Sequence, residues 1–395
     1  MKKKNPIERS IYIHEQYKEY LRSSFYFKNA KLQKLFKQQL EKEDLFKGPY
    51  VDLILPFQRG KCLDELIEEG VVCNSFKELG DMDFERPLYY HQEKAIRHIC
   101  SGKSAVITTG TGSGKTESFL YPILNEIMKD IENGNNDAGI RAVFLYPMNA
   151  LVNDQIDRVR KILSQYPLIK FGFFTGDTKE SVGNNYRQVK SEESGINIPE
   201  NELVSRQEIR ATPPHLLFTN YSMLEYLLIR PNDYSIFSPK LLNNWKFVVL
   251  DEAHSYYGAL GIEISLLMRR VTGLSPKKPR FILTSATLGA EGKSEAEIVE
   301  FARNLTSAPF EISDIIFSKR IPFDYKNLEY AVENDDYSRI KAVMYDYDAV
   351  EKLVNKYIKI KSSNVKEYLF ELLSRDKNVY NLFNILKNSS KSFKP

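Results

Sequence analysis

Residues 105–116 read AVITTGTGSGKT, and this stretch decides the fold of the 395-residue chain. The apolar run Ala105–Thr108 predicts a short buried strand, and Glu117–Met128 has the pattern of a helix. Glycines between them let the backbone turn closely, so that main-chain N–H groups and the positive helix N-terminus face an anion. The pattern predicts a site for the phosphates of a nucleotide, formed by Thr109, Gly110, Thr111, Gly112, Ser113, Gly114, Lys115 and Thr116.

Two side chains of this loop carry the chemistry. Lys115 supplies a full positive charge to the β and γ phosphates, and the hydroxyl of Thr116 can ligate Mg²⁺. The strict phosphate-loop pattern opens with Gly, whereas this sequence has Thr109 at that position. A glycine-rich turn without function is the alternative, and the strand–loop–helix context argues against it.

The region from residue 86 to residue 305 alternates short apolar runs with helical stretches. Each run is nearly continuous in apolar residues, which is typical of parallel strands covered on both faces. The predicted strands are Ala105–Thr108, Val143–Tyr146, Phe171–Phe174, Leu216–Thr219, Phe247–Leu250 and Phe281–Thr284. The pattern predicts an α/β fold, an open parallel sheet with helices on both faces and ligands at the carboxyl ends of the strands.

The two flanking regions have helical patterns. Residues 1–85 hold an apolar stripe at Leu32, Leu35, Phe36 and Leu40, which predicts an accessory helical leader packed on the next domain. Residues 306–395 hold two further stripes, one at Val350, Leu353, Val354 and Tyr357 and one at Val365, Tyr368, Leu369, Leu372 and Leu373. The second is preceded by Asn364, which is expected to cap a helix with Glu367.

A pair of acidic residues follows the fifth predicted strand. Asp251 comes directly after Leu250, and a carboxylate at a strand end can hold Mg²⁺, usually through water. Glu252 is then placed to orient or deprotonate an attacking water. Adjacent acids alone are a weak signal, but a buried strand before them and a phosphate loop upstream make these two strong candidates.

The motifs TGTGSGKTE, Asp251-Glu252-Ala253-His254 and Ser285-Ala286-Thr287 resemble motifs I, II and III of the superfamily 2 DEAD/DEAH-box helicases. The resemblance implies a RecA-like sheet and an ATP-dependent helicase that uses ATP and Mg²⁺. It implies that Ser285 and Thr287 belong to the nucleotide site and that His254 couples the nucleotide state to strand binding. Tyr89 and Gln92 resemble the Q-type motif, in which the Gln reads the adenine edge.

Three further loops resemble the strand-contacting motifs of that family. The phrases YPMNALVNDQ (146–155) and LYYHQEKAI (88–96) resemble the branch with a C-terminal metal-binding cysteine cluster, which includes DNA repair and phage-defence helicases. The resemblance implies contacts with the backbone of a single strand, most simply in single-stranded or tailed DNA. The implied contact residues are Pro147, Asn149, Gln155, Thr175, Gly176, Thr219, Asn220 and Tyr221.

The family's second RecA-like domain, with its arginine finger, and the family's cysteine cluster are not recognisable after residue 305. Arg269 and Arg270 are expected on the helix after the DEAH motif, and Arg280 is expected to open the strand before Ser285. The chain is therefore expected to be an incomplete motor, whether a fragment, a truncated product or half of a split motor with a second chain. One alternative is a nucleotide-gated nucleic-acid-binding subunit with little catalysis, and another is an unrelated P-loop enzyme such as a small-molecule kinase.

Composition limits these interpretations. The formal net charge is +4, from 56 basic and 52 acidic residues, which excludes a histone-like polycation but permits a local basic groove. Cys62, Cys73 and Cys100 stand far apart, so neither a zinc ribbon nor a disulfide framework is expected. No signal peptide or membrane-spanning run is recognised, and a cytoplasmic location without a membrane partner is expected.

Overall fold

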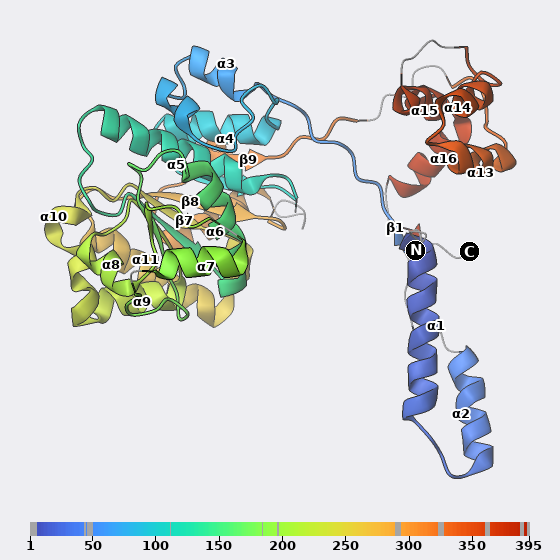
Figure 1. The fold of residues 1–395 in the computed structure, drawn as a ribbon, viewed down its shortest axis with the longest axis horizontal. Coiled ribbons are helices and arrows are strands. Elements are labelled where there is room, and N and C mark those ends of the chain that lie inside the picture. Colours follow the sequence, from blue (N-terminus) through green and yellow to red (C-terminus); the bar gives the residue numbers. More distant parts are fainter. Residues whose placement is uncertain are drawn as a thin grey trace. The chain divides into compact units, whose positions relative to one another are not determined.

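The computed structural model describes residues 6–42, 45, 50–110, 112–183, 185–195, 197–288, 294–322, 328–359, 364–387 and 391–392. The chain forms two compact units (Figure 1). The larger unit comprises residues 57–321, and the smaller unit combines residues 1–56 with residues 322–395.

The larger unit is built on an eight-stranded sheet with the order β5-β4-β6-β3-β7-β8-β2-β9, in which every strand pair is parallel. The strands are β2 (Ala105–Thr108), β3 (Ala142–Tyr146), β4 (Phe171–Phe174), β5 (Glu202–Leu203), β6 (Leu216–Asn220), β7 (Phe247–Leu250), β8 (Arg280–Ser285) and β9 (Ile315–Phe317). The six predicted strands and the parallel α/β class are confirmed.

Helices cover both faces of this sheet because every central strand is apolar on both sides (Figure 1). Phe144 of β3 packs in the core on one face, whereas Val143 and Leu145 pack in the core on the other. The first face is covered by α3 (Leu63–Glu68), α4 (Tyr90–Cys100), α5 (Lys115–Glu132) and α6 (Asn149–Leu163). The second is covered by α8 (Arg206–Ala211), α9 (Tyr221–Ile229), α11 (Gly258–Leu274) and α12 (Glu295–Thr306).

Shorter elements complete the larger unit. They are the helices α7 (Tyr186–Ser194) and α10 (Pro239–Leu242) and the 3₁₀ turns η1 (Asn74–Glu78), η2 (Pro231–Phe237), η3 (Ala253–Ser255) and η4 (Ile312–Asp314).

The larger unit extends past both predicted domain boundaries, 85/86 and 305/306. Residues 57–85 belong to it because Leu63, Leu66 and Phe76 are buried in the core beside α4 and α5. Residues 306–321 belong to it because β9 pairs with β2 along the sheet edge. Sequence analysis missed β9 and β5, which have three and two residues and are too short to show a periodic pattern.

The smaller unit is mostly helical. It contains α1 (Pro6–Ser24), α2 (Ala30–Lys42), α13 (Asn334–Val343), α14 (Tyr347–Val354), α15 (Val365–Ser374) and α16 (Lys377–Leu386), with β1 (Tyr50–Val51) paired antiparallel to β10 (Lys391–Ser392). The predicted stripes form a core in which Val350, Val354 and Leu372 are fully buried. Asn364 caps α15 as predicted, since its side chain accepts hydrogen bonds from the N–H groups of Lys366 and Glu367.

Trp245 offers a direct test of the core beside β7. It is 1% exposed, its ring lies 5.4 Å from that of Phe237, and its Nε1 donates to the carbonyl of Phe247 at 2.9 Å. Trp245→Ala should lower the free energy of unfolding by about 3–5 kcal/mol, because it removes a large buried ring and leaves a cavity. Chemical denaturation followed by circular dichroism measures this, with Tyr234→Ala, at a 60% exposed position, as the control. Equal stability of the two variants would contradict the packing described.

Candidate nucleotide and nucleic-acid site

The sheet order gathers the sequence motifs along one edge of the larger unit. The phosphate loop follows β2, the DEAH residues follow β7 and Ser285 ends β8, and these three strands are neighbours. The loops predicted to contact a strand follow β4, β6 and β3, which are also neighbours. Carboxyl ends of parallel strands meet at one edge, so the motifs predicted for the nucleotide (the nucleotide half) and the loops predicted for nucleic acid lie side by side and join between β3 and β7.

The phosphate loop has the backbone geometry that its glycines permit. Gly112 and Gly114 both have φ near 70°, a left-handed conformation that residues with a Cβ rarely adopt. The hydroxyls of Thr109 and Ser113 lie 2.7 Å apart, and the N–H of Thr109 donates to the carbonyl of Ser285 at 3.0 Å. Thr109 therefore closes the loop through its hydroxyl, which Gly could not do. Gly110 belongs to the described residues, and Thr111 lies outside them.

Side chains of the Q-type motif form hydrogen bonds with backbone carbonyls of the phosphate loop. His91 Nε2 lies 2.8 Å from the carbonyl of Ser113, and Gln92 Nε2 donates to the carbonyl of Gly114 at 3.0 Å. The other end of the Gln92 amide accepts a hydrogen bond from the N–H of Tyr89 at 2.8 Å. Burial lowers the pKa of His91, which favours the neutral ring at this position. His91 thus has a part in the site that sequence analysis did not assign to it.

An aromatic cluster lies next to this motif. Residue 57 bridges to residue 320 and residue 59 bridges to residue 89, so three distant segments meet here. The Phe57 ring lies 5.2 Å from the Tyr89 ring and 5.3 Å from the His91 ring, and the Arg320 guanidinium lies 3.4 Å from the Phe57 ring centre. A Cβ placed on Gly110 would lie 3.6 Å from Arg320, so this cation borders the phosphate loop. Sequence analysis did not assign Phe57 or Arg320 to the site: the segment Pro56-Phe57 only resembles the family branch named above, and Arg320 belongs to no motif.

The DEAH residues connect the phosphate loop to β8. Lys115 Nζ donates to Glu252 Oε1 at 2.6 Å, so the two charges predicted to handle phosphate and water are paired with each other. Glu252 has φ 46°, a left-handed conformation that costs a residue with a Cβ about 1–3 kcal/mol and that clusters at functional sites. His254 Nδ1 lies 3.2 Å from the hydroxyl of Ser285, which is fully buried. The Ser285 hydroxyl also accepts hydrogen bonds from the N–H groups of Thr287 and Leu288.

Asp251 is the candidate for a metal site. Its carboxylate accepts a hydrogen bond from the Thr284 hydroxyl, and its pKa is raised, chiefly because the protein removes it from water. A desolvated carboxylate with few donors around it favours a bound cation. Thr116 lies one residue into α5, at the end that faces the loop, so an oxygen from each motif is available and the residues fit Mg²⁺.

The three predicted strand-contacting loops contact one another. Asn220 Nδ2 donates to Asn149 Oδ1 at 2.8 Å, which joins the end of β6 to the start of α6. The Thr219 hydroxyl donates to the carbonyl of Phe174 at 2.6 Å, which joins the ends of β6 and β4. Thr219 is fully buried and its hydroxyl joins two loops, whereas the nearly buried Thr175 hydroxyl accepts from the N–H of Asp177 within its own turn. The remaining predicted contact residues at this edge are Pro147, Gln155, Gly176 and Tyr221.

Arg206 is a further cation at this edge. Its Nη2 donates to the carbonyls of Thr175 and Gly176 at 3.0 Å and 3.4 Å, and its guanidinium lies 5.1 Å from the Phe174 ring centre. No motif marks it in the sequence, because α8 follows the polar stretch at residues 179–202, whose composition indicates only a surface insertion.

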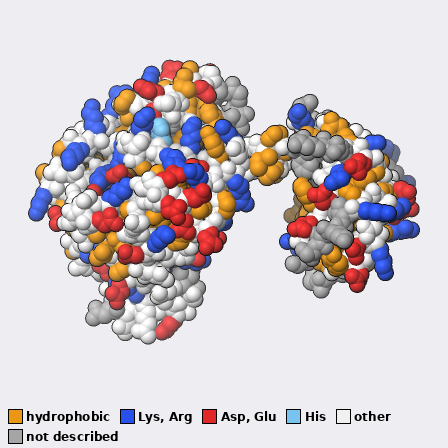
Figure 2. All heavy atoms as spheres, turned by 90° about the horizontal axis from the view of Figure 1, so that it is seen from above, with side chains coloured by type: hydrophobic (Ala, Val, Ile, Leu, Met, Phe, Trp, Pro, Cys, Tyr) orange, Lys and Arg blue, Asp and Glu red, His pale blue; other side chains and the backbone are white. Residues whose placement is uncertain are grey.

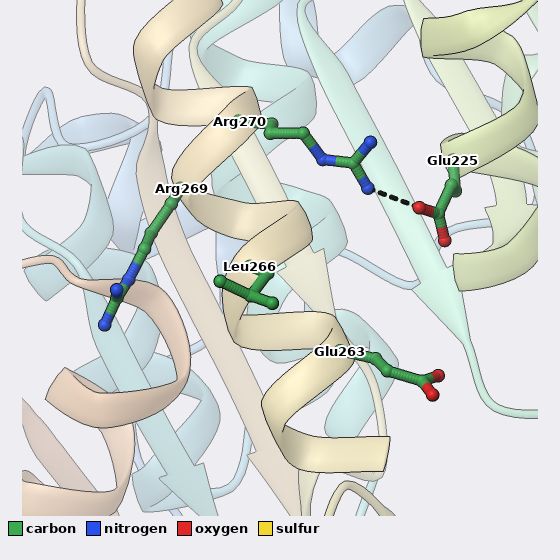
Figure 3. Close-up of a pocket in the computed structure, with 5 residues that line it drawn as sticks. All are labelled: Glu225, Glu263, Leu266, Arg269 and Arg270. Carbon is green, nitrogen blue, oxygen red and sulfur yellow. Dashed lines mark hydrogen bonds and ion pairs between the residues drawn. The ribbon is translucent and has the colours of Figure 1, made fainter. Parts of the chain in front are cut away.

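Three arginines near the motifs are where the sequence predicts them. Arg269 and Arg270 lie on α11, and Arg280 opens β8. Arg270 pairs with Glu225 at 2.5 Å beside a surface pocket of about 840 Å³ formed by α9 and α11, whereas Arg269 points to the other side of α11 (Figure 3). Arg269 donates to the Ser307 hydroxyl at 3.1 Å, and Arg280 pairs with Glu126 at 3.2 Å. All three have structural partners in this unit.

The visible face of the larger unit mixes both signs of charge. Lys and Arg side chains are interspersed with Asp and Glu over this face (Figure 2). In the part of the chain that the structure describes, no helix has the length and apolar character needed to cross a membrane.

Comparison with known proteins identifies the family. Residues 89–295, more than half of the chain, match the DEAD/DEAH box helicase family. The chain is 32% identical to the Druantia protein DruE of Escherichia coli, over 67% of this chain and 19% of DruE. It is 29% identical to the uncharacterized ATP-dependent helicase YprA of Bacillus subtilis, over 58% of this chain and 25% of YprA.

Comparison with solved structures supports the fold. The crystal structure of the DUF1998 helicase MrfA bound to DNA has a TM-score of 0.50 and 21% identity, and the match covers 87% of this chain and 44% of MrfA. The chain thus spans about a fifth to a quarter of the length of the two curated relatives named above. The matched residues run from Tyr89 through the phosphate loop and the DEAH motif to Glu295. This chain therefore belongs to the DEAD/DEAH box helicase family.

Proposed function

We propose that this chain is the ATP-binding and hydrolysing motor domain of a DNA helicase or translocase. One observation carries the proposal: the ends of β7, β8 and β2 bring Lys115 within 2.6 Å of Glu252, beside strand ends that carry three mutually bonded loops. A small-molecule kinase would need a binding site for the molecule that accepts the phosphoryl group. Next to the nucleotide motifs this edge instead has the loops that follow β3, β4 and β6. Support for DNA as the partner comes from MrfA, whose crystal structure contains bound DNA.

The residues act on ATP by positioning and charge. Lys115 leaves Glu252 when it contacts the β and γ phosphates, and Glu252 is then free to orient the attacking water. Thr116 and Asp251 would hold Mg²⁺, which would supply neutralisation of the developing phosphate charge. Phe57, Tyr89 and Arg320 offer flat surfaces for the adenine next to the phosphate loop. His254 contacts the Ser285 hydroxyl, and the Ser285 carbonyl accepts a hydrogen bond from the N–H of Thr109. Movement of the DEAH residues on ATP binding is thereby coupled to the phosphate loop.

Strand binding is assigned to the other half of the edge. Asn149 and Asn220 bond to each other, and the Asn220 Oδ1 also caps α9 by accepting from the N–H of Met223. The Asn149 Nδ2 and the second N–H of the Asn220 Nδ2 are then the donors proposed for a phosphate or sugar. Asn149→Ala combined with Asn220→Ala should weaken binding of a labelled single strand about tenfold in the presence of a non-hydrolysable ATP analogue. Fluorescence anisotropy measures it, and ATP affinity serves as the control because the substitutions lie outside the nucleotide half. Unchanged strand affinity would remove these loops from the proposed interface.

A second RecA-like domain is proposed as a partner, either from a further part of the protein or from a second chain. The described residues form a single RecA-like sheet, and Arg269, Arg270 and Arg280 are bound to structural partners. An arginine finger contributes about 10³–10⁵ in turnover in related phosphoryl-transfer enzymes, so the chain alone should turn over ATP barely above background. These paired arginines also favour the second candidate function, a nucleotide-gated nucleic-acid-binding subunit with little catalysis of its own.

An unwinding assay tests the motor with the purified chain. A helicase steps by changing the distance between strand contacts on two RecA-like domains, and the described residues form one RecA-like sheet. We expect ATP binding but no strand displacement on a tailed duplex, even with excess ATP. ATPase measurements with and without an added partner then separate the motor from the gated subunit. Robust ATP-dependent unwinding by the chain alone would contradict the proposed need for a partner domain.

A further inference from the structure

The helical hairpin formed by α1 and α2 in the smaller unit carries a surplus of positive charge. Residues 6–42 contain eight basic residues and four acidic ones, so this short segment is far more basic than the chain as a whole. Arg22 pairs with both Glu19 and Glu41, so two of the four acidic residues are engaged with a single cation. The remaining cations of α2 and of the turn before it therefore lie in a surplus of positive charge.

Four lysines at intervals of three residues form a basic strip that winds partly around α2. Lys31, Lys34 and Lys37 lie three residues apart on α2, and Lys28 precedes the helix in the same spacing. Residues three apart on a helix are neighbours, separated by about 4.5 Å along the axis. All four side chains are exposed, and within the described residues none of them has a carboxylate partner. On the same helix Leu40 is buried and Phe36 half-buried, whereas Leu32 and Leu35 are exposed like the lysines.

The turn between the two helices is fixed and holds an aromatic ring in solvent. The Asn29 side chain accepts hydrogen bonds from the N–H groups of Lys31 and Leu32 at 2.9 Å and 3.2 Å. The rings of Phe25 and Phe27 lie 6.3 Å and 5.5 Å from the ring of Phe36. Tyr26 lies between these two anchored residues and is 77% exposed. A ring held outside a fixed turn loses little freedom when a flat ligand stacks on it.

We propose that this turn and the basic strip of α2 form a second nucleic-acid site, which binds a single strand. Lysines without carboxylate partners neutralise phosphates, and an exposed aromatic ring stacks with an unpaired base, which is how single strands are bound without sequence preference. A protein-binding face is typically depleted in Lys, which makes a protein the less favoured occupant. The site lies outside the family motifs, and it does not depend on the proposed ATPase activity.

The test is strand binding by the full chain with two variants of equal charge. The first replaces Lys28, Lys31, Lys34 and Lys37 by Gln. The second, the matched control, replaces four exposed lysines of the larger unit by Gln, Lys103, Lys240, Lys277 and Lys278, which precede β2, β7 and β8. We expect binding of a labelled oligothymidine to weaken at least tenfold in the first variant at low salt and to change little in the control. The slope of log affinity against log salt should fall by about 2–3 in the first variant, since each phosphate contributes about 0.7 on single strands.

Tyr26 separates stacking from charge. Tyr26→Ala should weaken binding of the single strand about fivefold or more, while Tyr26→Phe keeps it and blunt duplex binding is unchanged in both. Equal loss in the two lysine variants would show non-specific attraction to net charge and overturn the site. Unchanged affinity in the strip variant would also overturn it and leave the hairpin as a surface for a protein. Loss of strand binding in the Asn149 and Asn220 variant alone bears on the motif loops and not on the hairpin.

Discussion

Lys115→Ala should lower the affinity of the chain for ATP at least a hundredfold. Lys115 is the cation of the phosphate loop, and it lies largely buried at the start of α5, where its charge is little screened by water. Removing one member of a desolvated charge pair costs about 2–5 kcal/mol, because the phosphate oxygens then lack a partner. Isothermal titration calorimetry with ATP and Mg²⁺ measures the loss. Wild-type affinity in this variant would contradict the phosphate-binding role of the loop.

The pair between Lys115 and Glu252 requires a specific control, since Lys115→Ala breaks it as well as removing the cation. Glu252→Ala breaks the same pair but leaves Lys115 in place. We expect Glu252→Ala to bind ATP as well as the wild type or better, because Lys115 no longer has to leave a carboxylate before it meets phosphate. If both variants lose ATP equally, the pair itself holds the loop in shape and Lys115 has no separate role.

Glu252→Gln should bind ATP normally and lower the rate of hydrolysis at least about a hundredfold. The amide keeps the shape of Glu252 but cannot accept a proton, and general base catalysis contributes about 10²–10⁴. The expected wild-type rate is low, so the measurement is a single turnover of radiolabelled ATP with protein in excess. The strained backbone of Glu252, with φ 46°, is unaltered by this substitution, so the fold of the loop should persist.

Asp251→Asn distinguishes the two acidic neighbours. This change removes the charge expected to hold Mg²⁺ while the hydrogen bond from Thr284 can remain. We expect ATP binding to lose its dependence on Mg²⁺, whereas Glu252→Gln should retain it. Titration of Mg²⁺ at fixed ATP compares the two variants. Identical behaviour would show that the division of roles between Asp251 and Glu252 is wrong.

In the larger unit, local sequence patterns predict some elements of the fold and not others. Its six longer strands could be predicted because each is an apolar run that must be buried on both faces, and the phosphate loop could be predicted because its glycines permit left-handed backbone. The motifs could also be placed at strand ends, since polar residues directly follow those runs. β5 and β9 could not be predicted, because strands of two or three residues are specified by the neighbouring strand and not by their own pattern.

By itself the sequence determined the fold class, the family and the identity of the charged residues at the strand ends, because these depend on residue type and order. Only the tertiary structure decided which of them meet. The order of the strands brings Lys115 to Glu252, and the packing of residues 57 and 320 against residue 89 brings Phe57 and Arg320 to the phosphate loop. Such contacts join segments that are distant in the sequence, and no local pattern carries their geometry. The physical reason is that pairing between parallel strands and burial of side chains are satisfied across the whole sheet at once.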